Sequence, residues 1–290
     1  MNSMSRLKNT RAHALVAICS AVVVTLAVTA FMYAHKSRVL AAEQDNRPAQ
    51  PAKLPAQQPS ASPVLVEIFT SEGCSDCPPA DALLAHLQQD QPIASANVIA
   101  LEEHVDYWDH LGWRDRFSSH DLTLRQNEYT SRLRLDDNYT PQMIVDGAEQ
   151  FVGSDSAKAL RAVAAAARTP KLRLVLSPLE VHGSQLSAAV SVEAGPAPLP
   201  GSDLYAALVQ RTATTRVASG ENGGRSLTHV STVLSLVKIG DARKAATPLP
   251  FSFKIPAGVD PANLDAVVFI QKTGQGEVQG AIASAPLVRP

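Results

Sequence analysis

The hydrophobic pattern of the chain begins with one long uncharged run, which extends from residue 14 to residue 33. A run of about 20 such residues can span the hydrocarbon core of a bilayer as a helix. His35, Lys36 and Arg38 separate it from the small residues near Ala41, so we predict an uncleaved anchor, and the basic residues in the segment 1–13 favour a cytoplasmic N-terminus. The alternative is a signal peptide that is cleaved near Ala41 or Ala42. Both interpretations export the rest of the chain, either held at the inner membrane with periplasmic domains or secreted to the periplasm.

A linker over residues 34–62 follows this run. From Glu43 to Ser62 it is rich in Pro, Gln and Ala and holds almost no large apolar residue. Such a composition cannot build a core and is typical of a semi-rigid, polyproline-like spacer. The spacer is expected to hold the folded part of the chain away from the membrane.

Two short apolar runs, Pro63–Thr70 and Asn97–Glu102, have the length and composition of buried strands. The sequence between them, Pro79–Gln89, has the pattern of a helix. Right-handed crossover connections make such strands parallel, so both carboxyl ends are predicted to lie at the same edge of a sheet.

A β-hairpin is predicted further along the chain, after a helical insertion. Residues 143–152 contain an apolar run, an Asp-Gly turn and a return strand, which together are a strong hairpin signal. Ser154 is the predicted N-cap of an alanine-rich helix that runs to Arg168. This order of elements is that of a thioredoxin fold, so residues 63–169 are predicted to form a thioredoxin-like α/β domain.

Beyond residue 170, alternation of apolar and polar residues replaces helical spacing. Gly and Pro turns divide this part of the chain into short candidate strands, a pattern typical of an all-β sandwich. Residues 170–290 are therefore predicted to form a second, β-sandwich domain. The candidate strands are 171–176, 185–192, 204–209, 230–239, 249–255, 266–271 and 278–283.

The composition agrees with this organisation and excludes one class of partner. The part of the chain after the linker is large enough for two domains with separate cores. The 290 residues are 45% hydrophobic and include 26 basic and 27 acidic side chains. Because the charges balance and no basic stripe is present, nucleic acid is not an expected partner.

Cys74 and Cys77 form a CxxC pair between the first predicted strand and the helix that follows it. Unpaired N–H groups and the dipole at a helix N-terminus favour a thiolate. The spacing therefore indicates nucleophilic attack by Cys74 and resolution by Cys77. A permanent structural disulfide is the main alternative. Half of a zinc site is another, but Cys19 lies in the apolar run and no second ligand motif follows, so no metal and no cofactor are expected.

Three neighbours of the cysteines in the expected fold are candidates for a supporting role. Pro141, which precedes a predicted strand, is expected to be cis and to leave nearby backbone groups free to pair with a substrate peptide. Thr140 borders the same docking groove. Asp76 lies between the cysteines and should oppose thiolate formation, which makes the couple more reducing. The alternatives are a trans turn for Pro141 and a solvent-facing helix cap for Asp76.

Carboxylates and histidines around the end of the second predicted strand are candidates for proton transfer. Glu102, Glu103 or Asp106 could act through water as the general base for the resolving cysteine. His104 is a second candidate base. With His110 it could also hold copper(I) together with the cysteines, because soft thiolates select that ion.

The same window holds both tryptophans of the chain, Trp108 and Trp113. Because the window leaves the end of a strand, its aromatic side chains could form one wall of a substrate groove near Cys74. Alternatively, they pack as a lid over the following helix, residues 119–133. The polar loop 221–224 presents a similar choice, since it could face the cysteines or merely connect two strands.

The chain also resembles a known family in five separated segments that occur in the same order. The resemblance is to the DUF1223 family of exported, thioredoxin-like bacterial proteins, and it covers about residues 63–290. It implies the fold and the candidate CxxC pair, and no particular activity. The segments are Glu67–Asp81, His104–Asp109, Leu111–Trp113, Tyr139–Gln142 and Glu221–His229.

Together these features predict a membrane-tethered periplasmic thiol-disulfide oxidoreductase. Its expected partner is a thiol or disulfide of another exported protein, and its N-terminal helix would hold it at the inner membrane. The alternative is a non-enzymatic copper-binding or interaction module that uses the same cysteines.

Overall fold

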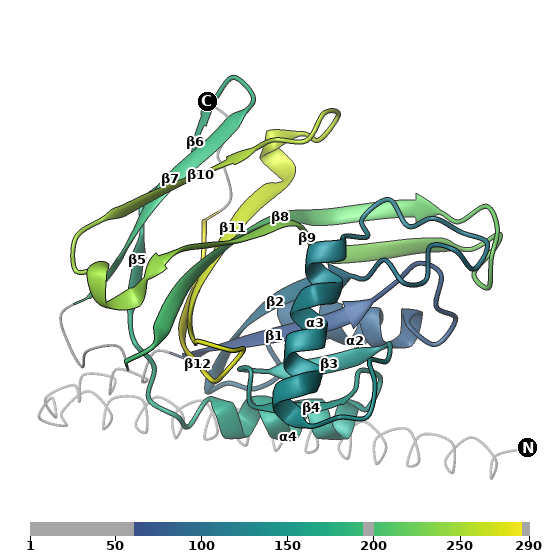
Figure 1. Ribbon diagram of the computed structural model, residues 1–290, viewed down its shortest axis with the longest axis horizontal. Helices are drawn as coiled ribbons and strands as arrows, with labels where there is room; N and C mark the ends of the chain where they lie inside the picture. Colours follow the sequence, from purple (N-terminus) through teal and green to yellow (C-terminus); the bar gives the residue numbers. More distant parts are fainter. Residues whose placement is uncertain (1–60, 194–199, 286–290) are drawn as a thin grey trace, which may run out of the picture. The chain divides into compact units, whose positions relative to one another are not determined.

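The structure is a computed structural model that describes residues 61–193 and 200–285 (Figure 1). The predicted anchor at residues 14–33 and nearly all of the predicted linker lie outside the described residues. Within the described ranges, no helix is long and apolar enough to cross a membrane. The described residues belong to one compact unit, Pro59–Pro290.

An eight-stranded mixed sheet runs through this unit, in the order β12-β11-β8-β9-β2-β1-β3-β4. The central strands β1 and β2 are parallel, and their register pairs Thr70 with His104. The helix α2 connects them, so the predicted strand-helix-strand unit is present and both carboxyl ends lie at one edge of the sheet. The strands are β1 (Ser62–Thr70), β2 (Ala96–His104), β3 (Gln142–Val145), β4 (Glu149–Val152), β8 (Ser202–Arg216), β9 (Ser226–Asp241), β11 (Leu264–Lys272) and β12 (Val278–Ala283).

Helices cover both faces of the α/β part of this sheet. One face of β1 carries Val66 and Ile68, which share a core with α2 and α4. The opposite face carries Leu65 and Phe69, which pack in the cores that include α3. Because side chains alternate along a strand, neighbouring residues of β2 also point to opposite faces. The helices are α2 (Pro78–Asp90), α3 (His120–Leu133) and α4 (Ser156–Ala166).

The predicted hairpin is formed by β3 and β4, which are antiparallel. Its turn contains Asp146 and Gly147, both with positive φ, as the Asp-Gly signal predicted. The predicted N-cap of the following helix is wrong by one residue. Asp155, rather than Ser154, caps α4, because its carboxylate accepts a hydrogen bond from the N–H of Lys158 at 3.0 Å.

The part of the chain beyond residue 170 differs from the predicted separate sandwich domain. The strands β8, β9, β11 and β12 extend the same sheet as β1–β4, and β9 joins it by pairing Thr232 with Glu102 of β2. Apolar alternation identifies a strand but not its neighbour, and the free edge of β2 supplies a partner that local sequence does not reveal.

A second, four-stranded sheet packs against the C-terminal part of the large sheet, as Figure 1 shows. Leu186 and Phe251 from the small sheet share one core with Leu208 and Val268 from the large sheet. Two packed sheets are thus present, but one of them is continuous with the α/β part. The strands of the small sheet are β5 (Leu174–Leu176), β6 (Glu180–His182), β7 (Gln185–Val192) and β10 (Leu249–Lys254), and short 3-10 helices lie at Ala242–Lys244 and Pro261–Asn263.

Candidate functional site

Cys74 and Cys77 form a disulfide at the start of α2. Cys77 occupies the N-cap position and Pro78 begins the helix, so the pair lies where the sequence predicted it, at a helix N-terminus. Cys74 is 1% exposed and Cys77 is 0% exposed. Neither residue is therefore open to a large reagent in this oxidised form.

The loop between β8 and β9 covers the turn that carries the disulfide. Asn222 is buried, and its side-chain amide donates hydrogen bonds to the carbonyl oxygens of Glu72 and Cys74 at 3.0 and 2.9 Å. The carboxylate of Glu221 accepts a hydrogen bond from the N–H of Ser75 at 3.0 Å. This loop connects two strands and also faces the cysteines, so both predicted roles hold at once.

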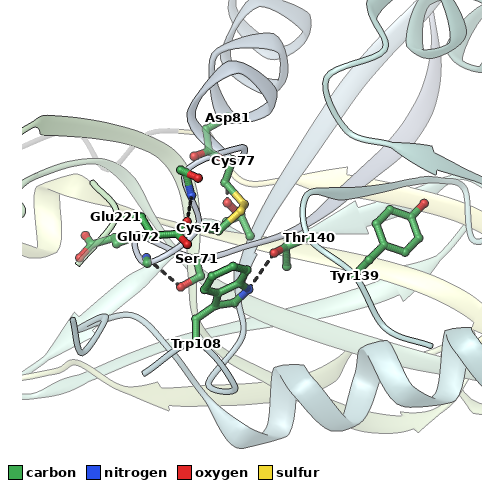
Figure 2. The surroundings of a disulfide bond; sticks show 12 residues. Ser71, Glu72, Cys74, Cys77, Asp81, Trp108, Tyr139, Thr140 and Glu221 are labelled. Carbon is green, nitrogen blue, oxygen red and sulfur yellow. Dashed lines mark hydrogen bonds between the residues drawn. A yellow bond between two sulfur atoms is a disulfide. The ribbon is translucent and has the colours of Figure 1, made fainter. Parts of the chain in front are cut away.

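The aromatic window supplies a second part of the cover. The indole N–H of Trp108 donates to the hydroxyl of Thr140 at 2.8 Å, and in Figure 2 the disulfide lies between this pair and Asp81. The peptide bond between Thr140 and Pro141 is cis. The indole N–H of Trp113 donates to Oε2 of Glu72 at 2.8 Å. These inward hydrogen bonds favour a packed cover over an open groove wall.

Asp81 is a site residue that sequence reasoning missed. It lies one turn after Cys77, whose carbonyl oxygen accepts the Asp81 N–H at 3.0 Å. The side chain is only 6% exposed, and its carboxyl group accepts a hydrogen bond from the hydroxyl of Thr70 at 2.8 Å. Burial, followed by the charge of Glu102, raises the pKa of Asp81 to about 7. The available signal was its position on the same helical stripe as Leu84, which is the buried face of α2.

Two of the predicted general bases do not reach the cysteines. Glu103 points to the opposite face of the sheet, where its carboxylate lies 3.6 Å from Nε of Arg125. Asp106 accepts a hydrogen bond from the Thr123 hydroxyl at 2.6 Å and lies 3.0 Å from Nδ1 of His120. The structure thus gives both carboxylates other partners, since the local sequence does not say toward which element a carboxylate points.

The exposure of Asp76, His104 and His110 decides between the alternatives that the sequence left open for them. Asp76 is exposed, and Cys77 rather than Asp76 occupies the N-cap position of α2. His110 is exposed, whereas His104 is fully buried, so the two do not form the predicted copper-ligand pair.

Five buried residues form a cluster on the face of the sheet that carries α2, and we call it the His104–His229 cluster. Nδ1 of His104 lies 2.6 Å from Asp115, and Nδ1 of His229 lies 2.8 Å from Oε1 of Glu102. The two imidazole rings are in edge-to-face contact, with centroids 4.8 Å apart. The members of the cluster are Glu72, Glu102, His104, Asp115 and His229.

The members of this cluster shift one another's pKa values. Burial alone would lower the pKa of His104, but the adjacent carboxylate of Asp115 outweighs it and raises that pKa well above its usual value. Burial likewise opposes the shift at His229, where the adjacent carboxylates of Glu102 and Glu72 raise the pKa to about 9. At Asp115, burial is outweighed by the charge of His104, which lowers the pKa to about 2.

A second buried polar group, which we call the Arg125 cluster, lies on the face that carries α3. The guanidinium of Arg125 donates to Glu67 and to the amide oxygens of Gln271 and Gln275, the last two at 3.0 and 2.6 Å. The hydroxyl of Tyr129 donates to the other oxygen of Glu67 at 2.6 Å. These bonds connect α3 to strands and loops at both ends of the chain. The members of the cluster are Glu67, Glu103, Arg125, Tyr129, Gln271 and Gln275.

Residues 65–271 match the model of the DUF1223 family, which is described as a protein of unknown function. The chain belongs to the DUF1223 family. The match includes the cysteine pair, Asp81 and both buried clusters except Gln275. It also crosses residue 170, in agreement with one continuous sheet through the DUF1223 region.

Two solved structures are similar to this DUF1223 protein. The crystal structure of protein AGR_C_4864 from Agrobacterium tumefaciens is 26% identical, with a TM-score of 0.58, and the alignment covers 81% of this chain and 100% of that chain. The structure titled HBP35 of Porphyromonas gingivalis is 16% identical, with a TM-score of 0.51, and the alignment covers 79% of this chain and 78% of that chain. The second likeness shows the fold alone. No protein with a curated description matches the sequence.

Proposed function

We propose that this DUF1223 protein is a thiol-disulfide oxidoreductase that acts on a partner protein. Cys74 is the nucleophile, Cys77 is the resolving cysteine, and Asp81 exchanges a proton with Cys77. The observation that carries the proposal is the placement of Asp81, which is buried one turn beyond Cys77 with a pKa raised to about 7 by burial and the charge of Glu102. A carboxyl group with a pKa near the working pH is suited to general acid-base catalysis.

The topology around the pair supports a thioredoxin-like unit. The strand order β2-β1-β3-β4, with a parallel pair on one side and an antiparallel hairpin on the other, is the one expected for that fold. The disulfide follows the carboxyl end of β1, at the edge of the sheet where α/β proteins bind their ligands.

The proposed exchange reaction uses the side chains of Cys74, Cys77 and Asp81. A thiolate of the partner attacks the sulfur of Cys74, the bond between Cys74 and Cys77 breaks, and Cys77 leaves as a thiolate. The carboxyl group of Asp81 gives its proton to that thiolate. A second partner thiolate then attacks the partner's own sulfur in the mixed disulfide and releases Cys74 as a thiolate. Two electrons thereby pass from partner to protein, and the reverse sequence reduces a partner disulfide.

Access to Cys74 requires movement of its cover. Because the residue is 1% exposed, a partner thiolate reaches its sulfur only after the Trp108 side chain or the loop around Glu221 is displaced. A partner segment that takes over these hydrogen bonds would open the site as it binds. The opening would thus confine exchange to proteins that fit the surface.

The compartment forms part of the same proposal. The apolar run at residues 14–33 and the Pro-rich linker support an exported protein that is tethered to the inner membrane. Its substrates would be other exported proteins, since thiols are readily oxidised to stable disulfides outside the cytoplasm.

The test is capture of the partner with Cys77→Ser in cells. This variant should accumulate a mixed disulfide when Cys74 attacks a partner disulfide, because Cys77, the thiol that breaks the mixed disulfide in this reverse direction, is absent. Cys74→Ser is the matched control and should capture nothing. If Cys77→Ser captures nothing while alkylation shows that the wild-type pair cycles, the substrate is not a protein.

Two other outcomes would replace the proposal. A pair that resists mild dithiothreitol, followed by differential alkylation and mass spectrometry, would be a structural disulfide. Stoichiometric copper that is lost on Cys74→Ser would support the copper-binding alternative.

A further inference from the structure

We propose that the His104–His229 cluster binds one divalent metal ion of the zinc class through Glu102, His104 and His229. The proposal does not rest on the redox function, because no cysteine is among the donors. It concerns a second site on the same face of the sheet, next to the cysteine turn through Glu72.

The geometry of the three donors is close to that of a metal site. Each residue can offer one donor atom within 4.8 Å of the other two. Oε1 of Glu102 lies 3.7 Å from Nε2 of His104 and 2.8 Å from Nδ1 of His229. Ligands about 2.1 Å from a zinc ion lie about 3.0–3.4 Å from one another, so small side-chain movements would complete the site.

Unpartnered buried atoms point to a missing ligand. Nε2 of His104, Nε2 of His229 and Oε1 of Glu72 are buried and make no hydrogen bond, and the last two lie 3.4 Å apart as an ion pair. A buried polar atom without a hydrogen bond is costly, so Nε2 of His104, which lies 3.7 Å from Oε1 of Glu102, requires an explanation. A cation bound to Nε2 of His104 would supply the partner that this atom lacks.

The charge of the cluster also calls for a cation. Glu72, Glu102 and Asp115 bring three buried carboxylates together. In the described part of the chain, no lysine or arginine forms an ion pair with any of the three, whose ion-pair partners are the two histidines. A divalent ion would offset these charges without a fixed cationic side chain.

The surroundings of both histidines match those of metal ligands. The second nitrogen of a metal-bound histidine usually faces a carboxylate, which sets its tautomer and orientation. Nδ1 of His104 lies 2.6 Å from Asp115, and Nε2 of His229 lies 3.4 Å from Glu72. Each ring thus has one nitrogen on an outer carboxylate and the other directed toward Glu102.

The donor set selects the class of metal. Two imidazoles and one carboxylate suit zinc and similar borderline divalent ions, whereas copper(I) prefers thiolates. The disulfide form of the cysteines offers no thiolate. The site is therefore distinct from the copper site considered from the sequence.

Metal content and cobalt substitution test the inference on the full-length chain, purified without chelators from zinc-supplemented cells. About one zinc per chain is expected by mass spectrometry. Reloading with Co²⁺ should give visible d-d bands without thiolate-to-cobalt charge transfer. Both signals should be lost in His104→Gln and in His229→Gln. They should persist in His182→Gln, which changes an exposed histidine, and in the double variant Cys74→Ser with Cys77→Ser.

The contrary results are equally definite. If wild-type protein carries no zinc as purified and shows no cobalt bands after reloading, the cluster is a set of buried ion pairs between imidazolium groups and carboxylates. Loss of binding in the cysteine double variant, or its persistence in both histidine variants, would move the site elsewhere. Zinc-dependent elevation of the wild-type Tm gives a readout that does not depend on the folding of any variant.

Discussion

The two faces of one sheet carry buried polar clusters of opposite character. In the Arg125 cluster, a permanent cation donates to Glu67 and two amide side chains, and the two oxygens that lack a hydrogen bond both belong to Glu103. In the His104–His229 cluster, only titratable histidines balance three carboxylates, and three polar atoms have no hydrogen bond. A network centred on a permanent cation holds elements together, whereas one balanced only by titratable histidines can change its charge and is available for chemistry. Cys74 and Cys77 lie beside the His104–His229 cluster.

Adjacent residues of β2 show how sharply the two environments differ. Burial opposes ionisation of Glu102, but His104 and His229 outweigh it and lower the pKa of that carboxyl group. Burial and the charge of Glu67 raise the pKa of Glu103 well above its usual value. The pKa values of two successive glutamates therefore shift in opposite directions, because their side chains point to opposite faces.

The largest expected effect is on the paired face. Arg125→Met should lower the free energy of unfolding by about 3–5 kcal/mol, because it leaves Glu67 buried without a cation. Urea denaturation measures this loss. The control Arg211→Met breaks a partly exposed pair with Asp265 and should cost less than about 1 kcal/mol. Equal losses would remove the distinction between a structural cluster and an ordinary ion pair.

The next largest effect is expected for the carboxyl group of Asp81, whose protonation should control the rate of disulfide reduction. Asp81 is mostly protonated below pH 7 and mostly ionised above it, since burial and Glu102 raise its pKa to about 7. The rate at which dithiothreitol reduces the disulfide, corrected for reagent thiolate, should therefore fall as the pH rises through 7. Asp81→Asn should be about 10- to 100-fold slower near pH 6 and should lack this fall.

The control for this experiment is Asp90→Asn, an exposed change at the other end of α2. It should retain the wild-type profile. Coincident profiles for Asp81→Asn and wild type would show that another group protonates Cys77.

A smaller effect is expected at the cover of the disulfide. Trp108→Phe removes the hydrogen bond to Thr140, which is worth about 0.5–1.5 kcal/mol, so reduction should become about 2- to 12-fold faster. Stopped-flow kinetics with a bulky thiol would measure this change. Ser177→Ala, which loses a hydrogen bond from the N–H of Ala189 in the small sheet, should leave the rate unchanged. Slower reduction in Trp108→Phe would mean that the indole assists exchange.

The smallest effect is expected for the substitution of Glu103. Glu103→Gln replaces a carboxyl group whose pKa is raised by burial and Glu67, so the free energy of unfolding should change by less than about 1 kcal/mol and the exchange rate by less than twofold. Glu102→Gln should be more damaging, since its carboxylate accepts from the N–H of Val230 and pairs with Nδ1 of His229. Thermal and urea unfolding of both variants compare the two faces directly. A larger loss of stability in Glu103→Gln than in Glu102→Gln would contradict the opposite pKa shifts of the two residues.

Local periodicity was sufficient to identify much of the α/β part. The strands β1 and β2, the helix α2 and the hairpin of β3 and β4 follow from runs of apolar residues and an Asp-Gly turn, because these signals act over a few residues. The CxxC pair could be placed at a helix N-terminus for the same reason. The family could also be identified from the sequence, because five motifs occur in the same order.

Tertiary structure alone decided which residues meet. Asp81 became part of the site because α2 turns that side chain onto the sheet, where burial changes its pKa. His229 reaches Glu102 only because β9 pairs with β2, which also joins the predicted sandwich to the α/β part as one sheet. Strand pairing and burial depend on elements far apart in the chain, so periodicity determined the elements of this protein and long-range packing determined its polar clusters.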